Sequence, residues 1–244
     1  MLWKAIVAEW IKLKKSPLWL VFFLLPILPA FLGTFNYLQN IEILESEWYS
    51  LWTQHTLFMC YFFLPALIGV YTSYLFHLEH QQHNWNALLS TPMPRVNYYL
   101  AKLLICIVLV VITQLWIAVL FVVSGLLVGL TMPLPVEFVW WILFGMIGGI
   151  VIAAIQLCLS MVIRSFAIPV GIAFVGGILG ILVISAGYGL IFPYTLMSVG
   201  MGSNGSDGIT IATVGSFLIA NLFYIIICIV FAGSWLKHRD VVTA

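Results

Sequence analysis

The chain has 244 residues and a formal net charge of +1, from nine lysines and arginines against eight aspartates and glutamates. Only 7% of its residues are charged and 64% are hydrophobic, whereas a typical soluble domain has about 25% and about 45–50%. So few charges cannot cover a water-exposed surface of this size, which excludes a soluble fold and indicates an integral membrane protein. The near-zero net charge also argues against a nucleic-acid partner, because phosphate binding needs a basic stripe.

Uncharged segments long enough to cross a bilayer follow one another along the chain, and a spanning helix needs about 20 apolar residues. We place spans near 17–38, 55–76, 100–129, 138–162, 167–189 and 209–235. The predicted fold class is therefore an all-α integral membrane protein with six transmembrane helices, in a single domain over residues 1–244. Residues 190–208 are rich in Gly and Ser, and hydropathy leaves open whether they form an outer loop or a partly re-entrant segment.

Residues 1–15 precede the first span and have an amphipathic pattern. Read as a helix, they place Trp3 and Trp10 on an apolar side and Lys12 on the opposite side. This pattern predicts a helix that lies in the membrane interface, with its lysines near anionic headgroups. The alternative is a basic flank that forms no helix.

The charges also predict an orientation. With six spans, both termini and all nine lysines and arginines fall on one side, and no basic residue falls on the other. The positive-inside rule then places both termini in the cytoplasm of a cell membrane. The outer side would carry an acidic group and an aromatic belt, made up of Glu42, Glu45, Glu47, Glu137 and Asp207, and of Trp48, Trp52, Trp140 and Trp141.

No catalytic, phosphate-binding or metal-binding motif is apparent. A G-x-x-x-x-G-K-[ST] loop is absent, so we do not expect the chain to hydrolyse ATP by itself. On a helix His77 and His80 would share a face but His83 would not, so three ligands could not converge and no metal site is predicted. The four cysteines lie inside apolar runs and are expected to be packing residues without a disulfide or zinc: Cys60, Cys106, Cys158 and Cys228.

Polar side chains within the spans are few. No Asp, Glu, Lys or Arg lies deep in a proposed span, which disfavours a proton-coupled transporter or a charged pore. The polar residues that remain are Gln114, Gln156, Ser160 and Asn221. They have two interpretations, namely hydrogen bonds between helices or the lining of a substrate path.

The longest inner connection, residues 78–95, mixes polar residues with an apolar edge made of Trp85, Leu88 and Leu89. A short helix with such an exposed edge is suited to docking into a groove on a partner protein. Pro92 and Pro94 would end this helix and restart the chain for the third span.

This connection resembles that of a known family. Its order of residues is similar to that of type-2 ABC exporter permeases. The pattern is Glu79, a few polar residues, the aromatic Trp85, Leu88-Leu89-Ser90-Thr91-Pro92, then Arg95, and Tyr99-Leu100-Ala101-Lys102 leading into a span. Within them, the chain is most similar to the small six-span permeases of lantibiotic immunity and bacitracin resistance, including a basic N-terminal helix with Glu9 and Lys12. The family often has Gly just before the aromatic residue, where this chain has Asn84.

The resemblance implies a bacterial transport subunit without enzymatic activity or a bound cofactor of its own. Its partners would be two ABC ATPase subunits, which bind ATP and Mg, and a second identical or related permease. The cargo would be a hydrophobic or amphipathic molecule, such as a cationic antimicrobial peptide. Six residues would form a cytoplasmic coupling helix that contacts the ATPase: Glu79, Trp85, Leu88, Leu89, Pro92 and Arg95.

Two other classes remain as alternatives. One is a secondary transporter or channel that is not driven by ATP, against which the absence of charge at the membrane midplane argues. The other is a membrane-embedded enzyme, for which only the region around His77 and His80 offers candidate residues.

Overall fold

The computed structural model describes residues 2–14, 16–44, 46–81, 85, 92–203 and 209–238. Within these ranges the chain forms helices and no strand. Leu88, Leu89, His83 and Asp207 lie outside the described residues, so the expectations that rest on them stay predictions.

The described part of the chain has six segments that are long and apolar enough to cross a membrane, so the predicted six-helix membrane fold is confirmed. They are α2 (Leu18–Leu24) with α3 (Ile27–Gln39), α4 (Glu47–Phe58) with the π-helical turn η1 (Met59–Phe63) and α5 (Leu64–His80), α7 (Val96–Val128), α8 (Glu137–Val162), α9 (Ala167–Ser185) and α11 (Ile211–Lys237). The helix α1 (Leu2–Lys14) precedes them.

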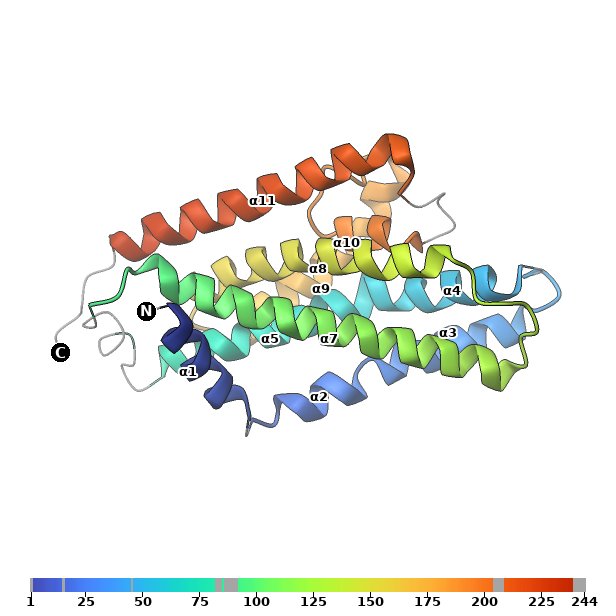
Figure 1. Cartoon of the computed structure of the whole chain (residues 1–244), viewed down its shortest axis with the longest axis horizontal. Coiled ribbons are helices and arrows are strands. Elements are labelled where there is room, and N and C mark those ends of the chain that lie inside the picture. The colour runs from blue at the N-terminus through green and yellow to red at the C-terminus, as the bar shows by residue number, and fades with distance from the viewer. Residues whose placement is uncertain are drawn as a thin grey trace.

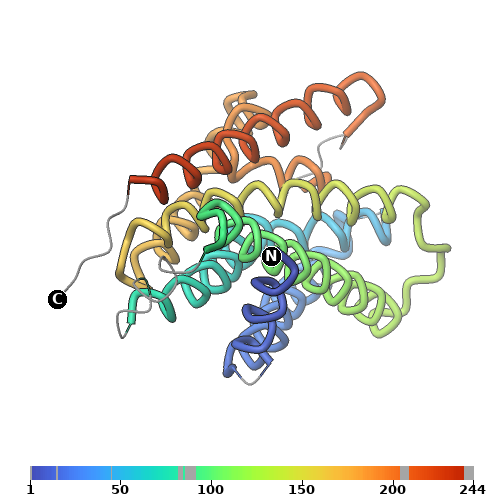
Figure 2. Tube along the Cα trace, turned by 60° about the vertical axis from the view of Figure 1, so that its left-hand side comes forward, coloured from blue at the N-terminus to red at the C-terminus, as the bar shows by residue number. Residues whose placement is uncertain are grey.

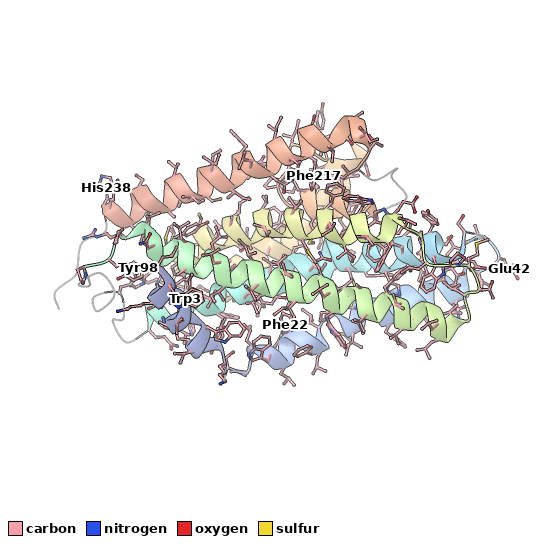
Figure 3. The ribbon with its side chains drawn as sticks, in the orientation of Figure 1. Trp3, Phe22, Glu42, Tyr98, Phe217 and His238 are labelled. Carbon is pink, nitrogen blue, oxygen red and sulfur yellow. The ribbon has the colours of Figure 1, made fainter. Side chains whose placement is uncertain are left out.

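The spanning helices run roughly along the long axis of the molecule, and α1 and the last turn of α11 lie at one end of it (Figure 1). We call this the α1 end. The connections 40–44 and 129–136 lie at the opposite end, which we call the hairpin end (Figure 1). Figure 3 shows Glu42 there, far from Trp3, Tyr98 and His238. Across the bundle, α11 lies on the opposite side of α7 and α8 from α1 and α2 (Figure 2).

Prolines interrupt the first two spans. Pro26 lies between α2 and α3, and Pro65 follows η1 in the second residue of α5. Because proline has no N–H, it cannot bond the carbonyl four residues earlier, and the helix breaks or rearranges there. The other four spans run without such a break.

The second span is longer than hydropathy predicts. It begins at Glu47 instead of near residue 55, and the whole segment Glu47–His80 is helical. Trp48 and Trp52 in the extra two turns are buried, and so is His55 directly after them. These side chains find hydrogen-bond partners inside the protein, which a sum of hydropathies does not register.

The aromatic belt expected from Trp48 and Trp52 is wrong. Their exposed fractions are 5% and 1%, because both rings pack inside the bundle. The Trp48 indole N–H donates to the Met132 carbonyl and that of Trp52 to the Met201 carbonyl, each at 2.7 Å. Trp140, by contrast, is 56% exposed.

The segment that follows α9 folds back into the bundle. Its helix α10 (Leu196–Gly200) packs against α8 so closely that a Cβ on Gly148 would lie 2.4 Å from the Met197 nitrogen. Gly148 is eleven residues from the start of α8, about 16 Å along that helix at 1.5 Å per residue. The described part of 190–208 therefore packs inside the bundle, which favours the re-entrant alternative over the outer loop, and its depth in a membrane stays a prediction. We call it the re-entrant segment.

Candidate functional site

Four charged side chains gather where α1 meets α5 and α7. Lys12 lies 2.8 Å from Glu9 and 2.5 Å from Glu79, and Lys102 lies 2.8 Å from Glu9 and 2.9 Å from Glu79. Glu9 and Lys12 are one helical turn apart on α1, Glu79 is near the end of α5, and Lys102 is in the second turn of α7. We call these four residues the ion cluster. Its two positive and two negative charges cancel.

Lys102 is the central member of the ion cluster. Its side chain is 1% exposed, and its ammonium donates to Glu9 Oε2, to Glu79 Oε1 and to the Leu75 carbonyl at 2.8–2.9 Å. An ammonium has three N–H donors, so each one has an acceptor. The Phe76 ring lies 5.1 Å away, within the range of a cation–π interaction. Lys102 lies near the start of α7 and not deep in the span, and the ion cluster replaces the water that it loses on burial.

Lys12 is the most exposed member, with 34% of its side chain accessible. Burial by itself lowers the pKa of Lys12, but the adjacent carboxylates of Glu9 and Glu79 outweigh it and hold the pKa above the usual 10.5. Lys12 is thus firmly charged at neutral pH, and it couples α1 to α5.

The predicted helix over residues 1–15 is present as α1. Trp3 and Trp10 are 74% and 39% exposed, as a helix in a membrane interface requires, although this location stays a prediction. Glu9 is 5% exposed and lies in the ion cluster, so one side of α1 packs on the protein and carries no free charge there.

His80 and Trp85 form a second contact beside the ion cluster. His80 Nε2 lies 2.8 Å from the Ser160 carbonyl, and the Trp85 indole N–H donates to His80 Nδ1 at 3.0 Å. These partners assign the neutral tautomer with its proton on Nε2, because Nδ1 must accept. His80 therefore joins α5, α8 and the connection that follows α5.

The exposure predicted for Trp85 is wrong, since only 7% of this residue is accessible. Its ring stacks on Phe76 with 5.8 Å between centroids and meets Trp235 of α11 at 5.9 Å. These two neighbours are far from Trp85 in sequence or on another span, so the sequence pattern could not show that the aromatic edge is covered.

Arg95 anchors the far end of the same connection. Its guanidinium donates to the carbonyls of Leu236 and Lys237, at 2.9 and 3.0 Å. These are the last carbonyls of α11, where a helix has unsatisfied acceptors and the negative end of its dipole. Pro92 is exposed. Of the predicted coupling residues that are described, Glu79, Trp85 and Arg95 therefore contact other elements of the chain, and Pro92 faces outward.

His77 and His80 each have a protein partner. His77 Nε2 lies 2.8 Å from the Gln81 amide nitrogen, and His80 is bonded as described above. Among the residues that the structure places, no three His, Cys, Asp or Glu side chains gather as a metal site would require. The four cysteines are free and buried.

The three amides proposed as a substrate path are buried. Gln156 is satisfied when its nitrogen donates to a backbone carbonyl at 3.0 Å and its oxygen accepts from the Tyr194 hydroxyl at 2.6 Å. Gln114 lies 3.5 Å from the Met201 sulfur, and Asn221 donates to the backbone of its own helix. The amide oxygens of Gln114 and Asn221 have no protein partner.

Sequence reasoning missed His55. It is fully buried in α4, and its Nε2 lies 2.9 Å from the Thr34 hydroxyl of α3. Thr34 donates to a backbone carbonyl of its own helix, so His55 donates from Nε2 and its buried Nδ1 has no partner. The sequence places His55 at the start of the predicted span near 55–76, and no local pattern indicates its partner on α3.

Comparison with known proteins bears on the same part of the chain. The profile of the ABC-2 family transporter proteins matches residues 5–180, which is well over half of the sequence and includes the whole ion cluster. The chain belongs to the ABC-2 transporter family. No curated protein and no solved structure matches it. Membership of the ABC-2 family makes the chain a multi-pass membrane transport subunit whose partner is an ABC ATPase.

Proposed function

We propose that this ABC-2 protein is the permease of an exporter that removes a hydrophobic or amphipathic peptide from a bacterial cell membrane, for immunity or resistance. The ion cluster is the observation that carries the proposal. It joins α1, α5 and α7 through a buried, fully bonded lysine at the end of the molecule where the basic residues lie. Under the positive-inside rule this end is cytoplasmic, which is where ATP is available.

The connection 81–95 would transmit the force of the ATPase. A ligand shifts a conformational equilibrium only through contacts that differ between the two states, so ATP-driven movement needs a rigid link to the spans. Trp85 and Arg95 provide this link, because both contact α11 and Trp85 also contacts α5. We infer two roles within the predicted coupling set. Glu79, Trp85 and Arg95 position the connection, and Leu88, Leu89 and Pro92 touch the ATPase.

The cargo is inferred from charge and from the resemblance to lantibiotic and bacitracin permeases. Glu42 lies at the hairpin end (Figure 3), Glu47 bonds the connection 129–136 and Glu137 directly follows it. An acidic outer face attracts a cationic peptide. Gln114, Gln156 and Asn221 would serve the passing cargo. Support comes from the unpartnered amide oxygens of Gln114 and Asn221, since buried polar atoms normally have partners.

A capture experiment tests the coupling assignment. The chain is co-expressed with an ABC ATPase subunit from the same genome and purified in mild detergent. The three versions compared are the wild type, Leu88→Asp with Leu89→Asp, and Leu134→Asp. Leu134 is an exposed leucine of the connection at the hairpin end, so it controls for the added charge. We expect the double variant to capture about tenfold less ATPase, which is the effect of losing about 1.4 kcal/mol of binding free energy. Equal capture by all three proteins contradicts the assignment.

A growth assay tests the cargo. Cells that express the complete transporter should survive a higher concentration of a lantibiotic or of bacitracin than cells with the Leu88→Asp and Leu89→Asp variant. If the ATPase is captured and hydrolyses ATP but neither peptide is tolerated better, the exporter assignment stands and the cargo class is wrong.

One observation favours a second candidate, a transporter driven by an ion gradient. His55 is buried within a span with an unpartnered ring nitrogen, and ionisable groups in membrane spans often mark proton pathways. Transport that resists vanadate but is lost in His55→Gln would favour this candidate over an ATP-driven exporter.

A further inference from the structure

The helices α3 and α4, with the connection between them, form a hairpin that has a break on each side. Before it, Pro26 separates α3 from α2. After it, the π-helical turn Met59–Phe63 and Pro65 separate α4 from α5. Sharp bends in helices occur at prolines and at π-turns, so both ends of the hairpin have the local structure of a hinge.

The two helices of the hairpin pack together as one unit. A Cβ on Gly33 would lie 2.7 Å from the Cα of His55, so only glycine permits this approach of α3 to α4. Two polar contacts then join the helices, between Thr34 and His55 at 2.9 Å and between Asn36 and Gln54 at 2.5 Å. The hairpin is therefore stiff between its two breaks.

The second break has an opposing surface on α9. Pro65 has no N–H for the Tyr61 carbonyl four residues earlier, so the normal helical bond is missing there. A Cβ on Gly177 would lie 2.4 Å from this carbonyl oxygen, which means that α9 meets the break with bare backbone. Few side chains lie in this contact: the Pro65 ring meets Gly177, and the Phe62 ring lies 6.4 Å from that of Phe174, so a tilt of α4 relative to α5 would move these rings over α9.

Hydrogen bonds near the hairpin end hold the hairpin against the rest of the bundle. The Glu47 carboxylate accepts from the Thr131 N–H at 3.2 Å, from the Thr131 hydroxyl at 3.1 Å and from the Met132 N–H at 2.9 Å. Trp48 and Trp52 donate to the carbonyls of Met132 and Met201. We call the bonds of Glu47 and Trp52 the latch, since they join α4 to the connection 129–136 and to the re-entrant segment.

The backbone at Glu47 is strained. Its φ is +37°, and it is the only residue other than glycine with a positive φ in the described part of the chain. Such a conformation persists only where surrounding contacts enforce it, and it is frequent at switch regions. Opening the latch would release this strain, which favours a second state of the hairpin.

We propose that the α3–α4 hairpin is a gate. It pivots at Pro26 and at the turn 59–65, and the latch keeps it closed over the re-entrant segment. The role of this gate as the exit for cargo rests on the proposed function. The existence of two hairpin positions does not, because it follows from the breaks and the latch.

Electron–electron distances between two spin labels test the gate on the full chain in lipid nanodiscs. The labels replace Ile43 at the tip of the hairpin and Val136 in the facing connection, which are 80% and 78% exposed. The four native cysteines are buried, so the introduced ones react preferentially. We expect one short distance in the wild-type background and a second, longer distance in Glu47→Gln with Trp52→Phe.

The size of this effect follows from the lost bonds. A hydrogen bond to a charged group contributes enough to shift an equilibrium about tenfold, so the longer component should rise by about tenfold or more. Glu42→Gln and Trp140→Phe are matched controls, since Glu42 is exposed on the same connection as the labelled tip and Trp140 is exposed on α8. The latch is refuted if the longer distance is absent from the variant Glu47→Gln with Trp52→Phe, or if it is equally populated in the two controls.

Pro65→Ala tests the pivot in the latch variant. Alanine restores an N–H for the Tyr61 carbonyl and stiffens the second span, so the longer component should shrink toward its wild-type level. Pro169→Ala, the same exchange in the first turn of α9, should leave it unchanged. No response to Pro65→Ala refutes the pivot at 59–65.

Adding the ATPase with ATP and vanadate separates this inference from the proposed function. An increase in the population of the longer distance supports both the gate and the ATP-driven function. No increase, in a chain whose latch variant does open, counts against ATP coupling and leaves the gate in place.

Discussion

The substitution Lys102→Met should destabilise the protein more than any other single loss of charge in it. The side chain keeps its length, but the ion cluster then holds two carboxylates and only one ammonium. Glu9 and Glu79 are 5% and 3% exposed, so water cannot replace the lost donor. Removing one partner of a buried ion pair costs about 3–5 kcal/mol, and Lys102 has three acceptors. We therefore expect a loss of about 3–5 kcal/mol in the free energy of unfolding.

Reversible unfolding in mixed micelles, followed by tryptophan fluorescence, measures this loss. Lys14→Met is the matched control, because Lys14 is exposed on α1 and its loss should change stability by less than about 0.5 kcal/mol. Glu79→Gln combined with Lys102→Met should be more stable than Lys102→Met alone, since Glu9 and Lys12 then remain as a neutral pair. The reasoning is refuted if Lys102→Met resembles Lys14→Met, or if the second substitution adds its own loss.

Three further predictions concern other contacts. Because the pKa of Lys12 is raised in the folded protein, its contribution to stability is complete below pH 10.5 and is lost as the pH rises through the folded value. The difference in Tm between wild type and Lys12→Met should therefore narrow above pH 10.5, and a constant difference contradicts this. Gly148→Ala should cost about 1–3 kcal/mol, because its Cβ would collide with the α10 backbone. Gly215→Ala is the control, because a Cβ at this position has no atom within 4 Å, and its Tm in thermal unfolding should equal that of the wild type. Trp85→Phe keeps the aromatic stack but loses the bond to His80, for about 0.5–1.5 kcal/mol, and an unchanged Tm would show that this bond adds nothing.

The sequence alone determined the class of the protein and the number of its spans. The predicted span near 138–162 agrees with α8 (Glu137–Val162), and the span near 100–129 agrees closely with α7 (Val96–Val128). These properties depend on local sums over about 20 residues, and a bilayer requires such runs whatever the tertiary structure. The loop pattern was also sufficient to indicate the ABC-2 family, which the profile match confirmed.

The sequence singled out parts of the candidate site but not their arrangement. Glu9, Lys12 and Glu79 were selected as an interfacial helix and a docking surface, and Lys102 only as the end of a motif. The structure brings these four residues together although Lys102 is 93 positions from Glu9 in the sequence and 23 positions from Glu79. No local pattern records such a pairing.

Tertiary structure alone decided three features. It buried Trp85 beneath α5 and α11, it extended the second span back to Glu47, and it turned the segment after α9 into the bundle. In each case a polar or amphipathic stretch became stable at depth because distant elements supplied its partners. Hydropathy measures the free energy of moving a segment out of water. Only the packed structure shows what that segment gains in return.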